Sequence, residues 1–240
     1  MGGASWPVTG SKGDWVDLFK KNKIIINPFQ ASNCSFNLDW KTEVQSKLEG
    51  KVLKNISVAC GGKKLLGEIV LTRSGIEGSG IYPLSPEIRL QLHNTKSAEI
   101  IIDFKPDLSL EKIIEKVNSK PANRNLTEHL KTHLHLGDGQ MQLLKTFLSK
   151  EDFLSSTILS KQIKEFKLIV TGTGPIEDAI STVGGVALEE IDQTFQLTKF
   201  PLHFVIGEML DYDAPTGGYL LQSCFSMAKY LSHHLNAMRF

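Results

Sequence analysis

The sequence has no long apolar run, and this shortage excludes a protein that crosses a membrane as a helix. Its longest apolar stretches, at residues 24–26 and 204–206, are far shorter than the roughly 20 residues that a bilayer requires. No basic segment followed by an apolar one, the pattern of a secretory signal, opens the sequence. We therefore expect a cytoplasmic protein without a membrane partner.

Cysteine and net charge are also scarce. The 3 cysteines, Cys34, Cys60 and Cys224, lie far apart and form no CxxC pair. An odd and scattered set excludes a disulfide framework or a zinc ribbon and fits reduced thiols in a core. The formal net charge of +1 gives no electrostatic reason to expect a nucleic-acid partner.

The motifs of several common enzyme classes are missing as well. Gly78 and Gly80 begin a GxG, but Pro83 stands where the third glycine of a dinucleotide fingerprint belongs. No serine lies in the GxSxG context of a hydrolase elbow. His129 and His133 have metal-ligand spacing, but no glutamate follows His129 and no cysteine is near. We expect a solvated helix face there and no metal.

The C-terminal part of the chain is the most informative segment. The apolar run at residues 200–206 predicts a buried strand, and a glycine-rich loop follows it. From residue 218 onward, apolar residues at three- and four-residue spacing predict an amphipathic helix. Free N–H groups at the helix start and nearby glycines predict an anion or a polar cofactor at residues 216–220. The alternative is that Gly217 and Gly218 serve only as a turn.

The rest of the chain predicts an α/β domain with an insertion. Residues 14–28 predict a helix and a β-branched strand that ends at Pro28. Short β segments follow, with Gly61 and Gly62 as a hairpin turn, and then three or four helices with start signals such as Ser109. A strand at residues 167–172 returns the chain to the first pattern. We predict one α/β domain from residues 1–28 and 166–240, interrupted by a β-rich subdomain at 29–106 and a helical subdomain at 107–165.

Three ordered segments resemble the signature of a known family. They are residues 180–192, the Gly-Glu-Met-Leu-Asp segment at 207–211, and the Pro-Thr-Gly-Gly-Tyr-Leu-Leu-Gln segment at 215–222. Together they closely resemble the C-terminal signature of the BaiN/YhiN-type NAD(P)/FAD-dependent flavoproteins, in the subgroup with GEMLD and APTGGYLL. Residues 2–7, 10–14, 31–34 and 75–79 resemble the middle of the same family. The resemblance covers essentially the whole chain.

The resemblance implies a mixed α/β fold, α+β overall. Residues 1–28 and 166–240 would be the C-terminal part of a FAD-binding Rossmann-like domain, interrupted by an insert with a small β-barrel-like part and a helical cluster. It also implies an enzyme, a FAD-dependent oxidoreductase that transfers hydride through the flavin, with NAD(P)H as a candidate donor. No residue stands out as a catalytic acid or base. The cofactor-binding residues that it implies are Gly2, Gly3, Gly184, Gly185, Gly207, Glu208, Asp211, Thr216, Gly217, Gly218, Tyr219 and Leu220.

Within this resemblance, Glu208 and Asp211 are expected to accept hydrogen bonds from flavin hydroxyls. Amides at the helix start near Gly218 are expected to face the pyrimidine edge of the isoalloxazine, with a glycine corner at Gly184 and Gly185 bordering the same ring.

The chain departs from the family at its start. The GxGxxG fingerprint and the acidic residue that binds the adenosine ribose lie upstream of the matching part, and Met1 stands where the family usually has threonine. From the resemblance we therefore expect half of the cofactor site to lie outside this sequence. The alternative function is a non-catalytic fragment or split-gene module, which needs a separate N-terminal half to bind FAD; a homo-oligomer is the other expected partner.

A weaker alternative is nucleic-acid binding by the helical segment. Acidic residues at Glu111, Glu115 and Glu128 interleave with the basic ones, which favours a solvated surface and no nucleic-acid partner. The basic residues are Lys112, Lys116, Lys120, Arg124, Lys131 and Lys145.

Overall fold

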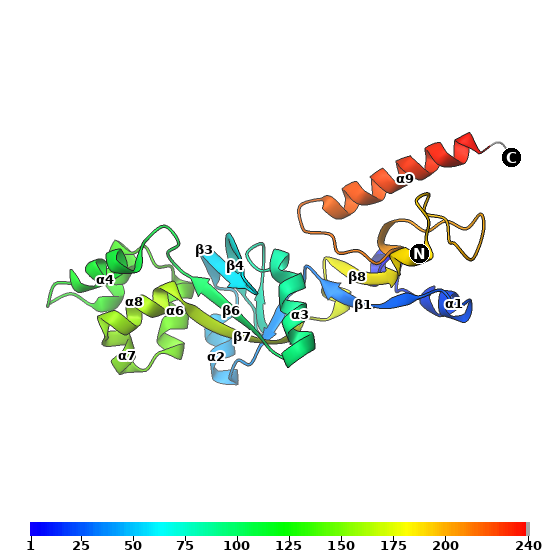
Figure 1. Ribbon diagram of the computed structural model, residues 1–240. Helices are drawn as coiled ribbons and strands as arrows, with labels where there is room; N and C mark the ends of the chain where they lie inside the picture. The colour runs from blue at the N-terminus through cyan, green and yellow to red at the C-terminus, as the bar shows by residue number, and fades with distance from the viewer. Residues whose placement is uncertain (239–240) are drawn as a thin grey trace. The chain divides into compact units, whose positions relative to one another are not determined.

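The computed structural model describes residues 1–238, which form two compact units (Figure 1). One unit combines Met1–Cys34 with the chain from Thr173 onward, and the other is Ser35–Gly172. Each is described by itself below. The finer division into a split domain and two inserted subdomains stays a prediction.

The Ser35–Gly172 unit contains a closed barrel of six strands. Five strand pairings of this unit are antiparallel, and Gly61 and Gly62 make the predicted hairpin turn with φ of 57° and 86°. Alternate residues along the strands, such as Ile100 and Ile102, are buried inside the barrel. In barrel order the strands are β2 (Phe36–Leu38), β5 (Gly75–Glu77), β4 (Lys63–Leu71), β3 (Val52–Cys60), β6 (Ala98–Asp103) and β7 (Phe166–Thr173).

Helices complete this unit, and the predicted mixed α/β fold with a small barrel and a helical cluster is confirmed. Side chains of Ser109 and Asn125 cap two helix starts by accepting a hydrogen bond from a first-turn amide. The cluster holds five helices where three or four were predicted. The helices are α2 (Thr42–Leu48), α3 (Ser85–Thr95), and the cluster α4 (Leu110–Asn118), α5 (Leu126–His133), α6 (Asp138–Phe147), α7 (Lys150–Leu154) and α8 (Ser156–Lys164).

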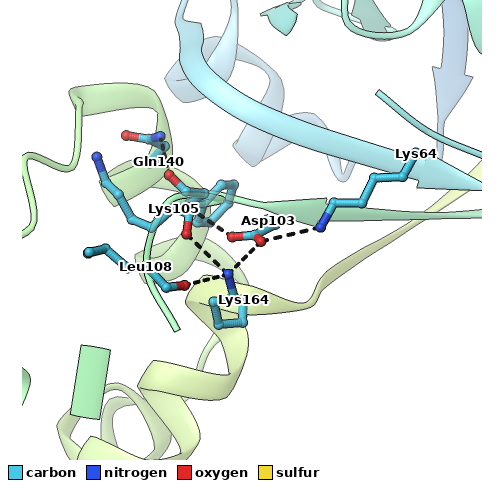
Figure 2. Close-up of polar contacts among 7 residues, drawn as sticks. Lys64, Asp103, Lys105, Leu108, Gln140 and Lys164 are labelled. Carbon is cyan, nitrogen blue, oxygen red and sulfur yellow. Dashed lines mark hydrogen bonds and ion pairs between the residues drawn. The ribbon is translucent and has the colours of Figure 1, made fainter. Parts of the chain in front are cut away.

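A buried carboxylate joins the barrel to the helical cluster (Figure 2). Asp103 ends β6, and its Oδ2 lies 2.6 Å from Lys164 Nζ at the end of α8. The same ammonium donates to the carbonyls of Lys105 and Leu108, at 3.1 and 2.7 Å. The amide of Lys105 donates to Asp103 Oδ1 at 2.9 Å. One ion pair thus fixes both the last helix and the loop that leaves the barrel.

The other unit is built on a two-stranded antiparallel sheet of β1 (Ile26–Ser32) and β8 (Ser181–Val186). A register shift between Asn27 and Gln30 accommodates Pro28. The predicted end of this strand at Pro28 is therefore wrong. A small core lies beside the sheet, made of Trp15, Ile24, Val186, Leu197, Val205 and Leu210.

Two further predictions in this unit are wrong. Residues 200–206 form no named strand, because Pro201 lacks an N–H and Leu202 has φ of +64°. Gly184 and Gly185 lie inside β8 and not at a corner. The Rossmann-like character of this unit stays a prediction.

The remaining helices of this unit are α1 (Val16–Lys21) and α9 (Tyr219–Ala237). The helix predicted after Gly218 is confirmed, but none of the 19 residues of α9 is buried. Leu221 and Phe225 are 63% and 68% exposed. Within residues 1–238, no helix has the length and apolar character needed to span a membrane.

Replacing Lys164 with methionine is expected to lower the free energy of unfolding by up to roughly 3–5 kcal/mol, because it removes the close counter-ion of the buried Asp103 carboxylate and leaves only the exposed Lys64 ammonium, at 3.7 Å. The matched control is Lys167→Met, which breaks an ion pair with Glu99 whose side chains are 59% and 44% exposed. That change should cost less than about 1 kcal/mol. Urea denaturation followed by circular dichroism measures both, and equal losses would contradict the role given to Asp103.

Candidate functional site

The candidate site is centred on β8, whose two glycines allow close backbone packing. Gly184 and Gly185 have φ of +100° and +126°, which L side chains rarely adopt. A Cβ on Gly184 would collide with the carbonyl of Pro28, and one on Gly185 would lie 2.5 Å from the carbonyl of Met209. The strand is therefore packed between β1 and the 3-10 turn Gly207–Met209.

Two carboxylates hold the segment at residues 207–211 on this strand. Glu208 Oε1 accepts from the amide of Thr182 at 3.3 Å, and Asp211 Oδ1 accepts from the amide of Gly184 at 2.9 Å. Asp211 Oδ2 also accepts from Asn27 Nδ2 at 2.6 Å. The amide of Asp211 in turn donates to the carbonyl of Val186. Both carboxylates are thus engaged with the protein's own backbone, a positioning role that the sequence did not indicate.

The N-terminal glycines lie in the same place. The amide of Gly3 hydrogen-bonds to the Glu208 carboxylate, and a Cβ on Gly3 would collide with the Thr182 hydroxyl. The carbonyl of Gly3 accepts from Ser11 Oγ at 2.6 Å, and that of Gly2 accepts from Trp15 Nε1 at 2.8 Å. The structure therefore brings together seven of the predicted residues: Gly2, Gly3, Gly184, Gly185, Gly207, Glu208 and Asp211.

The other five predicted residues form the loop and the first turn of α9. Gly217 and Gly218 have φ of +103° and +87°, and Gly218 is the N-cap of α9 without a side-chain capping bond. A Cβ on Gly218 would meet nothing within 4 Å. The backbone at this helix start is therefore open to a ligand. Thr216, Tyr219 and Leu220 complete this group.

Tyr212 connects the two groups, and the sequence did not single it out. Its hydroxyl lies 2.8 Å from Ser223 Oγ in α9, and Ser223 donates to the carbonyl of Leu220. Because the one hydroxyl hydrogen of Ser223 is thus used, Tyr212 is the donor between them. Cys224 Sγ lies within 3.8 Å of the same hydroxyl and would lie 3.4 Å from a Cβ on Gly207.

Further side chains that the sequence analysis missed fix the loop to β1. Ser32 Oγ donates to Asp213 Oδ1 at 2.5 Å, and Asn33 Nδ2 donates to the carbonyl of Ala214 at 2.7 Å and to Ser181 Oγ at 2.8 Å. Small polar residues beside a strand are a weak signal, because in a single sequence they are indistinguishable from ordinary turn residues.

Burial controls the electrostatics of the site. Desolvation raises the pKa of Glu208, and hydrogen bonds from the amides of Thr182 and Gly3 oppose part of this rise. Desolvation likewise raises the pKa of Tyr212 to about 12. Tyr212 is therefore a neutral hydrogen-bond donor at physiological pH. Thr182 Oγ1 is buried and has no hydrogen-bond partner within residues 1–238.

Of the histidines and cysteines singled out in the sequence, Cys224 contacts the candidate site, through Tyr212. No group of three or more His, Cys, Asp or Glu side chains among residues 1–238 could hold a metal ion. His129 is buried, so the expected solvated face is wrong for this residue, whereas His133 is exposed. Over the same residues, Cys34, Cys60 and Cys224 form no disulfide.

The uncapped amides, the open backbone at Gly218 and the clustered glycines fit a flat, polar and partly anionic cofactor such as a flavin. The residues that could contact it are those of the α9 start and of β8, whereas Glu208 and Asp211 hold these elements in place.

The chain is similar to a known family and to a curated relative. A family model described as HI0933-like protein barrel and H2TH domain matches residues 30–181, which include the whole barrel and the helical cluster. A ribosomal RNA dihydrouridine synthase of Escherichia coli (strain K12) is 23% identical over 234 residues. The match covers 95% of this chain and 57% of the synthase, so the chain spans little more than half the length of this relative.

Replacing Gly185 with alanine is expected to destabilise the protein far more than replacing Gly62, which also has positive φ but open space around its Cβ position. Strain alone costs about 1–2 kcal/mol at either site. The collision with the Met209 carbonyl adds a further ~1–3 kcal/mol at Gly185. Chemical denaturation of both variants measures the difference, and equal costs would show that the packing of β8 on Met209 is not tight.

The raised pKa of Glu208 predicts a pH-dependent stability. The folded state keeps this proton at pH values where the unfolded chain, with the ordinary value of 4.5, has released it. The contribution to stability is therefore complete below pH 4.5 and is lost as the pH rises through the folded-state pKa. The free energy of unfolding of the wild type, minus that of Glu208→Gln, should increase as the pH falls from neutral toward 4.5. A difference that shrinks over this range would refute the assignment.

Proposed function

The chain belongs to the HI0933-like barrel and H2TH family, a flavoprotein family, and from this premise we propose that it forms the flavin-facing part of a FAD-dependent oxidoreductase. One observation carries the proposal. The residues expected to bind the cofactor, although far apart in the sequence, lie on β8, on the segment fixed to it, and on the start of α9.

In this proposal the amides of the first turn of α9, after Gly217 and Gly218, contact the pyrimidine edge of the isoalloxazine. The backbone of Gly184 and Gly185 borders the ring. Glu208 and Asp211 act through the protein: they hold the amides of Thr182 and Gly184 and so set the position of β8. Tyr212 keeps the helix start against this segment through Ser223.

We propose uridine in RNA as the substrate, because the E. coli relative is named a ribosomal RNA dihydrouridine synthase. Reduction of the C5=C6 double bond of uracil adds one hydride and one proton, and bound reduced FAD supplies the two electrons. NAD(P)H is the proposed source of these electrons. This substrate replaces the expectation from net charge that no nucleic acid is a partner.

A second candidate is a module that needs a separate segment to complete the cofactor site. Two observations favour it. The sheet of this unit has only two strands within residues 1–238, and α9 leaves Leu221 and Phe225 exposed. Under this candidate, FAD binds only when the chain is combined with the segment that the relative carries outside the matched part. The chain purified alone and the combined protein, each titrated with FAD, distinguish the two candidates.

Gly218→Leu is the test of the flavin site. The variant should weaken FAD binding at least about tenfold, equivalent to about 1.4 kcal/mol, because its side chain fills the open space at the helix start. Gly62→Leu is the matched control, since Gly62 has φ of +86° against +87° and equally open surroundings. Quenching of flavin fluorescence measures binding in whichever protein, chain alone or combined, retains FAD. Equal affinities in the two variants would contradict the proposed site.

A further inference from the structure

Several cationic side chains gather where α5 ends. Lys116 Nζ, from the last turn of α4, donates to the carbonyl of His133 at 3.2 Å, and Lys105 Nζ donates to the carbonyl of His135 at 2.9 Å. The partial negative charge of the helix end attracts the Lys116 ammonium, and Lys105 binds a carbonyl just beyond the end of the helix. They reach this end from the loop after the barrel and from the neighbouring helix.

The loop between α4 and α5 adds two more cations. Arg124 Nη1 lies 3.4 Å from His133 Nε2, and Lys120 Nζ donates to the carbonyl of Arg124 at 3.1 Å. The ring of His133 lies 4.4 Å from that of the buried His129, centroid to centroid. Five cationic or titratable side chains are thus linked. We call this set the basic strip: Lys105, Lys116, Lys120, Arg124 and His133.

Among the described residues, no carboxylate forms an ion pair with the strip, whereas Lys131, Lys164 and Lys167 each pair with one. The charge of Asp107 acts on Lys105, where it opposes the lowering of the pKa by desolvation. After desolvation, the charges that lower the pKa of His133 are all positive, from His129, Arg124, Lys116 and His135. The strip is therefore a region of positive potential with spare hydrogen-bond donors.

The acidic residues that interleave with these cations in the sequence are separated from most of them along the helices. Glu111 lies in the first turn of α4 and Glu128 in the first turn of α5, while Lys116 and His133 lie in the last turns. Only Glu115 directly precedes a member of the strip. Opposite charges thus occupy opposite helix ends, as the helix dipoles favour.

We propose that the basic strip binds the phosphate backbone of RNA and so positions the substrate, an inference that rests on the proposed function. Charge complementarity identifies this partner, because lysine and arginine donors in a row contact successive phosphates. A lipid surface fits less well, since no large apolar side chain between residues 105 and 135 is exposed.

The junction described above sets the position of the strip. Asp103 holds the amide of Lys105, and Lys164 holds its carbonyl, so the Lys105 side chain leaves a fixed backbone (Figure 2). A groove lined by Asn55, Leu66 and the same Lys105 lies beside it. Glu68 and Asp107 also line this groove, so phosphates are not expected to enter it and the strip alone carries the contact.

The test is the double charge reversal Lys116→Glu/Arg124→Glu, assayed by fluorescence anisotropy with a labelled ribosomal RNA hairpin across a series of salt concentrations. RNA affinity should fall at least tenfold, and the slope of log affinity against log salt should decrease by about 1–2, because one to two phosphate contacts are lost. Lys47→Glu/Lys145→Glu is the matched control, with the same charge change at exposed positions of the same unit. It should leave the affinity nearly unchanged.

A second variant separates charge from helix capping. Lys116→Arg/Arg124→Lys keeps both charges and should bind RNA within about threefold of the wild type, and circular dichroism confirms that each variant is folded. If the control reversal weakens RNA binding equally, or if the strip reversal leaves the RNA affinity unchanged, the basic strip is not the RNA contact. The proposal that the chain binds RNA would still stand in that case. If the wild type does not bind RNA, or if it prefers anionic vesicles to RNA, the proposal that RNA is the substrate is wrong. FAD binding is titrated separately, so neither result bears on the proposed flavin site.

Discussion

The candidate site depends on two hydrogen bonds from backbone amides of β8 to carboxylates, those of Thr182 to Glu208 and of Gly184 to Asp211. They dock an irregular segment onto a strand that has only one partner strand in the described residues, and the amide of Gly3 joins the same carboxylate. The glycines, the N-terminal loop and the start of α9 keep their places because this docking holds.

This constraint also explains why the glycines are needed. With the segment docked, the carbonyl of Met209 lies where a side chain on residue 185 would stand, and the carbonyl of Pro28 does the same at residue 184. A pair of glycines in a sequence usually indicates a turn. Here the pair lies within a strand. Glycine is needed at both positions because two other backbones approach closely and leave no room for a Cβ, not because the chain changes direction.

Much of the barrel and helical cluster could be predicted because their signals are local. The hairpin at Gly61 and Gly62 and the capped start at Ser109 each depend on a few adjacent residues. The strand expected at residues 200–206 fails because Leu202 adopts a left-handed backbone beside Pro201. The roles of Thr182 and Tyr212 depend on partners distant in the sequence or on the turn that precedes α9, and no spacing rule reports such contacts. The site residues themselves came from a family resemblance, not from periodicity.

The most direct measurement of the central claim is amide hydrogen exchange with and without FAD, in the chain alone or in the combined protein, whichever binds the cofactor. If FAD lies against the start of α9 and β8, its binding should slow exchange in peptides covering residues 182–186 and 217–221, because the ligand would cover both segments and make their opening less frequent. FAD binding that leaves exchange in both peptides unchanged would contradict the proposed flavin site.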